Sequence, residues 1–319
     1  MTGARTLVAL ACAAGLALAA AAPAQATFPG RNGKIAFEKT NPSTGVTTIF
    51  TVNPDGSGLT RVTGRDTGGP AWSSDGRWLA FHDTGDEAMS GVHLWVQRAN
   101  GSHRHQVSFG GKDQGYPAWS PDGTRLAFDG NWFDNHSPDG FHSGVGVVDV
   151  RTGTMREITS THGIDGSPVW SPDGRQIVFQ RIFEGPNGPN TALYTVRPDG
   201  SHLKRVVGYW MDPSAPAWSP DGTRILFDTH DEQLSDTVAA NLATVPRGGG
   251  HITVLTHNDP TAEASFMPVY APDGHILFVR YHFGDDHTTL VIVNADGTHR
   301  RTLVTPFRLA LNPDWGVAP

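Results

Sequence analysis

The sequence predicts an all-β fold, a six-bladed β-propeller whose blades are four-stranded antiparallel sheets. Three observations predict it. One motif recurs along almost the whole chain, each repeat contains four short β-rich runs, and the two chain ends each carry part of one further repeat. Self-similarity at such a period is typical of stacked or radially arranged units, and four antiparallel strands per unit is typical of a propeller blade.

The recurring motif is clearest as Pro-Ala-Trp-Ser-Pro-Asp-Gly at residues 117–123, followed by an apolar run that ends at Phe128. Its Ser-Pro-Asp-Gly core predicts a tight turn, because Pro presets φ at the first corner and Gly accepts a positive φ. The aromatic position of the motif recurs every 45 to 52 residues, at Trp72, Trp119, Trp170, Trp218, Tyr270 and Trp315.

Each repeat provides four strands in order. The Pro-x-Trp segment is the first and innermost strand, and the apolar run after the turn, such as 177–179, is the second. A third strand such as 193–196 follows a longer loop, and a second Asp-Gly turn leads to the fourth, such as 203–207. Because Pro cannot donate to a ladder, we expect it at the start of the innermost strand, which pairs on one side only. The Trp two residues later is expected to pack between neighbouring blades.

The two chain ends complement each other. The first repeat begins at its second strand, 34–37, whereas the C-terminus carries Pro313, Asp314 and Trp315 with no second strand after them. Together they complete one blade, and their pairing closes the ring and shields its strand edges. Residues 27–319 are therefore expected to form a single propeller domain.

Residues 1–26 have the pattern of a signal peptide. Arg5 precedes an apolar, Ala-rich run at 7–22, and Ala24, Gln25 and Ala26 form an A-x-A cleavage site. The run is short for a membrane span, so we expect export to the extracellular space or to the cell envelope or periplasm, with no stable membrane span after cleavage. Cys12 is the one cysteine, so the mature chain would have no disulfide and no thiolate metal site.

Composition and motifs narrow the function classes. The formal net charge of −7 gives no reason to expect a nucleic-acid partner. The G-x-S-x-G, H-E-x-x-H and phosphate-loop motifs are missing from the sequence. We therefore expect a monomeric protein without a cofactor that is not an enzyme, although catalysis by residues from separate blades stays open.

The connections between strands fall on two faces. The tight Asp-Gly turns share one face, called here the turn face, and the longer, variable connections share the other, the loop face, where binding usually resides. Aromatic residues beside His and Asp on the loop face could bind sugar rings, a peptide or a partner protein, or could pack their own loops. The candidate ligand-binding residues on this face are Trp132, Phe133, His136, His142, Trp210, Asp212, His230 and His282, together with Asp113 and Asp165.

Asp113, Asp165 and Asp212 belong to a set of acidic residues that precede the Pro-x-Trp strands. They could ring the mouth of the central channel or cap the turns that lead into the first strand, and turn chemistry is the favoured interpretation. A second recurring position follows the Phe of each second strand. It is occupied by Glu38, His82, Asp129, Gln180, Asp228 and Val279.

Four residues of this second set, His82, Asp129, Gln180 and Asp228, are weak candidates for metal ligands through their N and O atoms. They belong to the second strand and not to the innermost one, and the sixth position is Val, so no metal is predicted. Polar strand ends that are merely solvated are the alternative.

The pattern Trp-Ser-Pro-Asp-Gly-x-x-Ile/Leu-Ala-Phe resembles the repeat of the TolB-like propellers, the WD40-like PD40 repeat family, over about residues 28–316. The resemblance implies a six-bladed propeller. TolB itself is periplasmic, binds a peptidoglycan-associated lipoprotein on its propeller face and carries a separate N-terminal domain that this sequence does not show, so we expect a family member other than TolB. Other propellers of the wider family are metal-dependent lyases that act on sugars.

The resemblance and the residues together predict a secreted, non-enzymatic scaffold that binds a protein or a cell-envelope polymer through its loop face. The alternative is a metal-dependent hydrolase or lyase that acts on a carbohydrate or lactone at the channel mouth. Fold alone does not decide between these functions.

Overall fold

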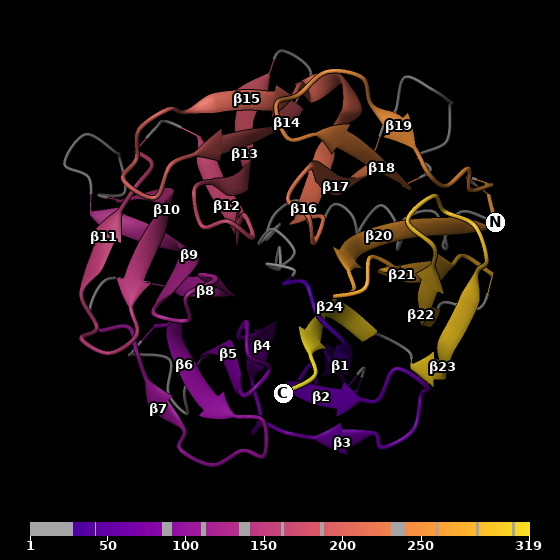
Figure 1. Ribbon diagram of the computed structural model, residues 1–319, viewed down its shortest axis with the longest axis horizontal. Coiled ribbons are helices and arrows are strands. Elements are labelled where there is room, and N and C mark those ends of the chain that lie inside the picture. Colours follow the sequence, from indigo (N-terminus) through magenta and orange to yellow (C-terminus); the bar gives the residue numbers. More distant parts are fainter. Residues whose placement is uncertain are drawn as a thin grey trace.

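The computed structural model describes residues 28–41, 43–84, 91–109, 113–133, 141–160, 163–185, 188–230, 240–259, 261–284, 287–307 and 310–319. These residues form six four-stranded antiparallel sheets arranged radially around a central axis (Figure 1). The predicted six-bladed propeller is confirmed. The predicted signal peptide lies outside the described residues.

The blades are numbered in chain order. Blade 1 contains β24 (Ala310–Val317), β1 (Asn32–Thr40), β2 (Thr47–Val52) and β3 (Thr60–Arg61); blade 2 contains β4 (Thr67–Trp72), β5 (Trp78–Asp83), β6 (His93–Arg98) and β7 (His105–Gln106). Blade 3 contains β8 (Gln114–Trp119), β9 (Arg125–Phe133), β10 (Phe141–Asp149) and β11 (Met155–Glu157); blade 4 contains β12 (Ile164–Trp170), β13 (Ile177–Gly185), β14 (Gly188–Val196) and β15 (Lys204–Val207). The 3-10 helix η1 (Tyr209–Met211) leads to blade 5, with β16 (Pro213–Trp218), β17 (Arg224–Thr229), β18 (Asn241–Pro246) and β19 (Thr253–Val254); blade 6 contains β20 (Glu263–Tyr270), β21 (Ile276–His282), β22 (His287–Val293) and β23 (Arg301–Phe307).

The chain ends close the ring as predicted. The C-terminal strand β24 pairs antiparallel with β1, and Trp315 lies opposite Ile35 in the register (Figure 1). Trp315 is buried, and its Nε1 donates to the carbonyl oxygen of Gly33 at 3.2 Å. The inner edge of β1 is therefore covered by the other end of the chain.

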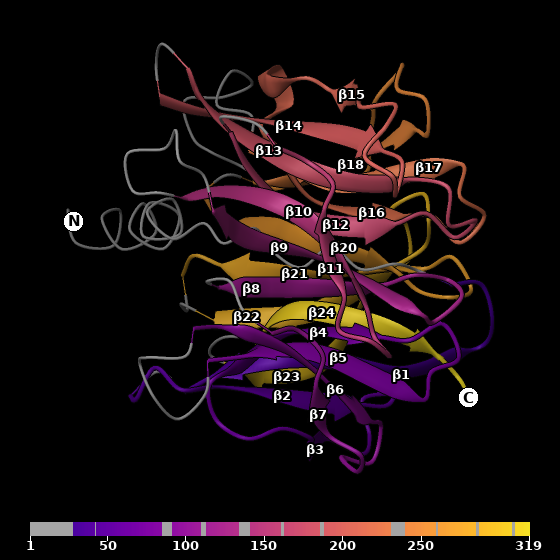
Figure 2. The same ribbon diagram turned by 90° about the vertical axis from the view of Figure 1, so that its left-hand side faces the viewer.

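The Ser-Pro-Asp-Gly segments form the predicted turns. In blade 3, Ser120 Oγ donates to Asp122 Oδ1 at 2.5 Å, Arg125 N donates to Ser120 Oγ at 3.0 Å, and Gly123 has a φ of 67°. Short polar side chains thus satisfy the turn backbone, which explains why the motif recurs. Viewed from the side in Figure 2, the turn face is the one at which the C-terminus emerges.

The innermost strands differ from the prediction in one respect. Pro70 is the fourth residue of β4 and does not start it, and the register of β4 against β5 shifts between Gly68 and Ala71. The prediction was wrong because a β-bulge, like a strand start, releases a residue from the ladder and so tolerates Pro. The six innermost strands each contain a bulge residue with positive φ: Gly69, Tyr116, Ser167, Ala215, Met267 and Asn312.

The motif tryptophans pack between blades as expected. Trp218 is fully buried, and its Nε1 donates to the carbonyl oxygen of Val169 in the preceding blade at 3.2 Å. Trp119 makes the same bond to Ala71 at 3.1 Å. Within the part of the chain that the structure describes, no helix is long and apolar enough to cross a membrane.

Candidate functional site

The residues that follow the Phe of each second strand lie beside the innermost strand of the next blade. We call Glu38, His82, Asp129, Gln180, Asp228 and Val279 the acceptor ring. Gly69 N donates to Glu38 Oε1 at 2.5 Å, and Met267 N donates to Asp228 Oδ2 at 2.7 Å. Ser167 N lies 3.4 Å from Asp129 Oδ2, and Tyr116 N lies 3.5 Å from His82 Nδ1.

In each of these four contacts the donor is the bulge residue with positive φ in the next blade. The bulge turns that N–H out of its own ladder, so a partner from the preceding blade must satisfy it. At the sixth position Val279 offers no acceptor, and Asn312 N instead lies 3.4 Å from Met267 Sδ. The main role of the acceptor ring is therefore to join neighbouring blades.

Burial shifts the titration of the ionisable members in blades 1 to 3. It raises the pKa of Asp129 to about 7, even though N–H groups of Ser167 and Gly115 lower it. It raises the pKa of Glu38 as well, and it lowers the pKa of His82 to about 4, so that the imidazole is neutral at pH 7. These side chains pack so closely on the backbone that residue 68 has no room for a side chain. A Cβ on Gly68 would lie 2.7 Å from His82 Nε2 and 2.8 Å from Glu38 Oε1.

The four weak metal candidates belong to this ring. Asp228, fully buried, accepts from Met267 N and also from the hydroxyl of Ser214, while Gln180 Oε1 has no hydrogen-bond partner among the described residues. Among the described residues, no group of three or more His, Cys, Asp or Glu side chains is arranged to hold a metal ion. Contacts with backbone N–H groups explain the polar side chains of Glu38, His82, Asp129 and Asp228, but not that of Gln180.

The acidic residues before the Pro-x-Trp strands occupy several different roles. Asp113 Oδ1 accepts from Val92 N at 3.0 Å, and Asp212, with a φ of 39°, caps η1 by donating its N–H to Tyr209 O. Asp165 is fully buried and accepts from Arg181 Nε at 2.6 Å and Nη2 at 2.8 Å. Turn chemistry therefore accounts for Asp212, whereas Asp113 contacts a segment twenty-one residues earlier in the chain and Asp165 forms a buried ion pair with an Arg sixteen residues away in the next strand, contacts that the sequence did not reveal.

Two candidates of blade 3 pack within their own sheet. Trp132 on β9 is half-buried, its ring centroid lies 5.8 Å from that of Phe128, and its Nε1 donates to Gly144 O at 3.2 Å. His142 Nε2 on β10 lies within hydrogen-bonding distance of Glu157 Oε1 on β11, at 2.5 Å. His136 and the side chain of Phe133 lie outside the described residues.

The two candidate histidines His230 and His282 lie in blades 5 and 6. His230 Nδ1 lies 3.4 Å from the carbonyl oxygen of Asp212 and 3.9 Å from Asp228 Oδ1. His282 stacks on His287 with ring centroids 4.7 Å apart. Among the described residues, the structure therefore distributes the predicted candidates over blades 3 to 6, where Trp132 lies opposite His142 in one sheet and His230 contacts Asp212.

The connection from blade 4 to blade 5 carries two adjacent exposed aromatic residues, whereas Phe109, which follows β7, is exposed by itself. Tyr209 and Trp210 on η1 are 51% and 52% exposed, and their rings meet at 72° with centroids 6.3 Å apart. Phe183 on β13 packs edge-on against Tyr209 at 6.4 Å. We call Phe183, Tyr209 and Trp210 the aromatic corner; of its members, the sequence singled out Trp210 as a candidate, but the contact with Phe183 required the tertiary structure.

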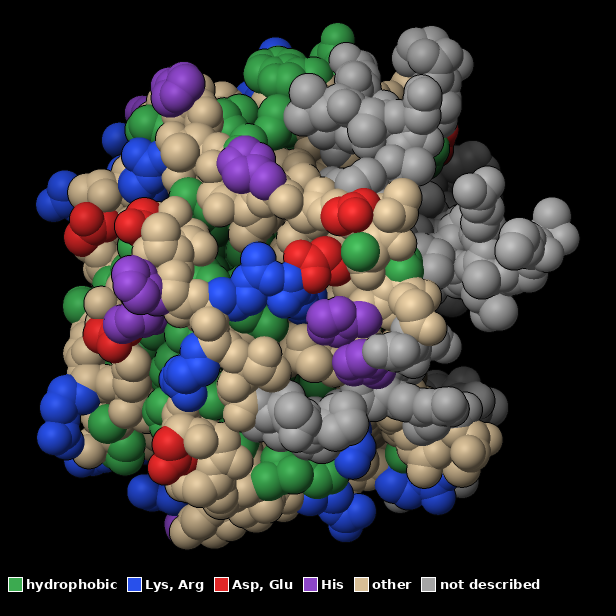
Figure 3. All heavy atoms as spheres, turned by 90° about the vertical axis from the view of Figure 1, so that its right-hand side faces the viewer, with side chains coloured by type: hydrophobic (Ala, Val, Ile, Leu, Met, Phe, Trp, Pro, Cys, Tyr) green, Lys and Arg blue, Asp and Glu red, His purple; other side chains and the backbone are tan. Residues whose placement is uncertain are grey.

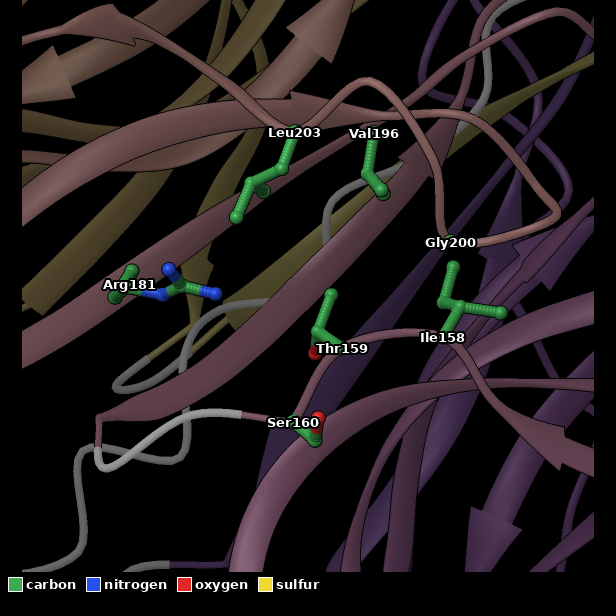
Figure 4. A pocket seen from close by; sticks show the side chains of 7 residues that line it. All are labelled: Ile158, Thr159, Ser160, Arg181, Val196, Gly200 and Leu203. Carbon is green, nitrogen blue, oxygen red and sulfur yellow. The ribbon is translucent and has the colours of Figure 1, made fainter.

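Among the described residues, a pocket of about 170 Å³ lies between blades 3 and 4, where Thr159 and Leu203 face Arg181 (Figure 4). That volume is below the roughly 300 Å³ at which small-molecule sites begin, and the Arg181 guanidinium is already paired with Asp165. On the side shown in Figure 3, basic, acidic and His side chains are interspersed, and hydrophobic areas are small.

Comparison with known proteins extends the picture. The family model of the TolB beta propeller domain, PD40, matches residues 69–318. An uncharacterized protein of Agrobacterium fabrum, Atu1656, is 30% identical over 144 residues, which cover 42% of this chain and 47% of the relative, so the match spans about half of that protein.

Two solved structures share the fold. TolB from Acinetobacter baumannii superimposes with a TM-score of 0.73 at 21% identity, covering 91% of this chain and 68% of that one. An oligogalacturonate lyase in complex with manganese gives a TM-score of 0.53 at 15% identity, covering 86% of this chain and 74% of that one. At these identities the likeness shows the fold alone.

Proposed function

Because the chain belongs to the family of the TolB beta propeller domain, we propose that it is an exported, non-enzymatic propeller that binds a protein or a cell-envelope polymer through its loop face. The observation that carries this proposal is the aromatic corner. Its two outer rings are about half exposed, on a short helix between two rigid blades. Large aromatic side chains held rigidly at a surface are the residues that most often dominate binding energy.

Packing of the fold does not require the rings of Tyr209 and Trp210 at this exposed position. Trp210 lies over Gly208, where a Cβ would come within 1.8 Å of the indole, so the sequence keeps a glycine beside an indole that is still 52% exposed. Met211, the third residue of η1, is buried and anchors the helix. A buried anchor beneath two exposed rings favours a binding surface over internal packing.

The alternative, a metal-dependent lyase or hydrolase, has weaker support. Three of its four candidate ligands, His82, Asp129 and Asp228, contact backbone N–H groups of the next blade. The likeness to the oligogalacturonate lyase shows a shared fold and carries no residue of that enzyme over to this chain.

The test compares three purified proteins in binding to fractionated cell-envelope material. The first is wild type, the second has Tyr209→Ala and Trp210→Ala, and the third has Leu59→Ala and Leu203→Ala, which removes two similarly exposed apolar side chains from outer parts of blades 1 and 4. We expect at least a tenfold loss of binding for the corner variant, as for a hot spot of about 2 kcal/mol, and none for the leucine variant.

The nature of the bound material follows from treatment of the fraction. Protease sensitivity of the binding identifies a protein partner, and sensitivity to glycan-degrading enzymes identifies a polymer. Equal binding by the wild type and the corner variant would overturn the proposal for this surface.

A further inference from the structure

The hairpin of β21 and β22 in blade 6 places two histidines directly opposite each other. His282 is the last residue of β21, His287 is the first residue of β22, and the two are partners in the register. Directly opposed residues of an antiparallel pair project their side chains from the same face of the sheet. Their rings stack with centroids 4.7 Å apart and an angle of 18° between planes.

We propose that His282 and His287 form a chelating site for a late first-row divalent cation, Cu²⁺ foremost, with Ni²⁺ and Zn²⁺ bound more weakly. Imidazole nitrogen suits these metals, and their affinities rise to a maximum at Cu²⁺. Bonds of about 2.0–2.1 Å to one metal bring two nitrogens to within about 3–4 Å of each other. In the stacked arrangement the ring nitrogens point along nearly parallel planes, so binding one metal requires both rings to turn about χ1 and χ2 until their nitrogens converge, and χ2 is a broad torsion in His.

The described neighbours of the pair narrow the donor set. Glu263 on β20 lies opposite His282, but its carboxylate is paired with Arg280. Thr289 Oγ1 lies 3.3 Å from His282 Nε2, a long contact that a metal bond can replace. Two imidazole nitrogens do not suit Ca²⁺ and Mg²⁺, which require oxygen ligands.

Another histidine pair provides a matched control. His103 and His105 in blade 2 both pack edge-on against Trp78, with centroids 6.5 Å and 6.2 Å from its ring. The Nδ1 atoms of both contact oxygen atoms, at 3.0 Å and 2.9 Å. Replacing them removes the same number of imidazoles from a β-strand region without touching the opposed pair.

The experiment is a calorimetric titration of the metal-free full chain with Cu²⁺, repeated with Zn²⁺, for the wild type and two double variants. His282→Ala/His287→Ala should bind Cu²⁺ at least about tenfold more weakly at this site, whereas His103→Ala/His105→Ala should bind like the wild type. The paramagnetic resonance spectrum of the first Cu²⁺ equivalent should show coupling to two imidazole nitrogens in the wild type and lose it in the first variant.

A single variant, His287→Gln, keeps a polar side chain at the hairpin and guards against misfolding of the double variant. Its thermal midpoint without metal should equal that of the wild type, and Zn²⁺ should raise the midpoint of the wild type but not of this variant. Unaltered Cu²⁺ affinity in both blade 6 variants, or an equal loss in the His103/His105 variant, would overturn the proposal.

Discussion

The acceptor ring and the aromatic corner both contain residues that sequence inspection marks as candidate binding groups, yet they differ in what the fold requires of them. In the ring, Glu38 and Asp228 accept N–H groups that the bulges of the next blade would otherwise leave unpaired. In the aromatic corner, the side chains of Tyr209 and Trp210 are half exposed, and neither residue belongs to a strand of a blade. Contacts with backbone N–H groups thus explain the polar side chains of the acceptor ring. No contact in the described structure explains why the rings of Tyr209 and Trp210 are exposed.

The ring itself contains an internal comparison. Blades 1 to 3 place the ionisable groups Glu38, His82 and Asp129 at a position where blade 6 has the fully buried Val279. A repeat can therefore form without a polar acceptor, as long as another atom, here Met267 Sδ, meets the bulge N–H. This position therefore accepts different side chains. Because the side chain contacts the next blade, we expect its replacement to lower the stability of the fold more than the function.

The largest expected effect comes from the strand that completes blade 1. Deleting residues 310–319 removes β24, leaves the inner edge of β1 unpaired, and takes away the buried Trp315 and Asp314. We expect a loss of more than about 4 kcal/mol in the free energy of unfolding, the cost of removing a large buried aromatic residue with its strand. Urea unfolding followed by circular dichroism measures it, and deletion of Pro319 alone is the control. An unchanged midpoint would show that ring closure contributes nothing.

A smaller loss should follow the removal of one acceptor. Asp228→Ala leaves Met267 N and the Ser214 hydroxyl without their shared partner in a buried position, which should cost about 2–3 kcal/mol. Asp228→Asn keeps one acceptor oxygen and should cost less. The Tyr209→Ala/Trp210→Ala variant of the corner should change stability by no more than about 0.5 kcal/mol per residue. If the corner variant proved less stable than Asp228→Ala, the contrast between the two regions would fail.

A further effect on stability depends on pH. Burial raises the pKa of Asp314, whose Oδ2 accepts from Trp72 N, to about 7. Since the folded-state pKa lies above the unfolded value near 3.8, the native state binds the proton more tightly. Its contribution to stability is complete below about pH 4 and disappears as the pH rises through 7.

Asp314→Asn mimics the protonated form and retains an acceptor for Trp72. It should therefore be more stable than the wild type at pH 8, by about 1–2 kcal/mol, and this gain should vanish at pH 4. Thermal unfolding of both proteins across this range tests the prediction, because the turn-face carboxylates common to both cancel in the difference. A gain that grows towards low pH would contradict it.

Much of the architecture could be predicted because it depends on local chemistry. The Ser-Pro-Asp-Gly turn closes with bonds from Ser120 to its own neighbours, so the sequence within seven residues specifies it. The incomplete repeats at the two ends predicted their pairing, which the register of Trp315 with Ile35 confirms. The position of Pro70 was predicted wrongly, because a bulge and a strand start impose the same restriction on Pro and cannot be told apart by pattern.

The sequence by itself therefore determined the number of blades, their strand order, the turns and the closure, all of which follow from one local motif that recurs along the chain. Only the tertiary structure decided which partner each polar or aromatic side chain meets: Arg181 for Asp165, the bulge N–H of Met267 for Asp228, and Phe183 for Tyr209. These partners come from other strands or from the next blade, at separations that vary with loop length. The repeat pattern fixes the backbone, but contacts between blades depend on how those backbones pack in space.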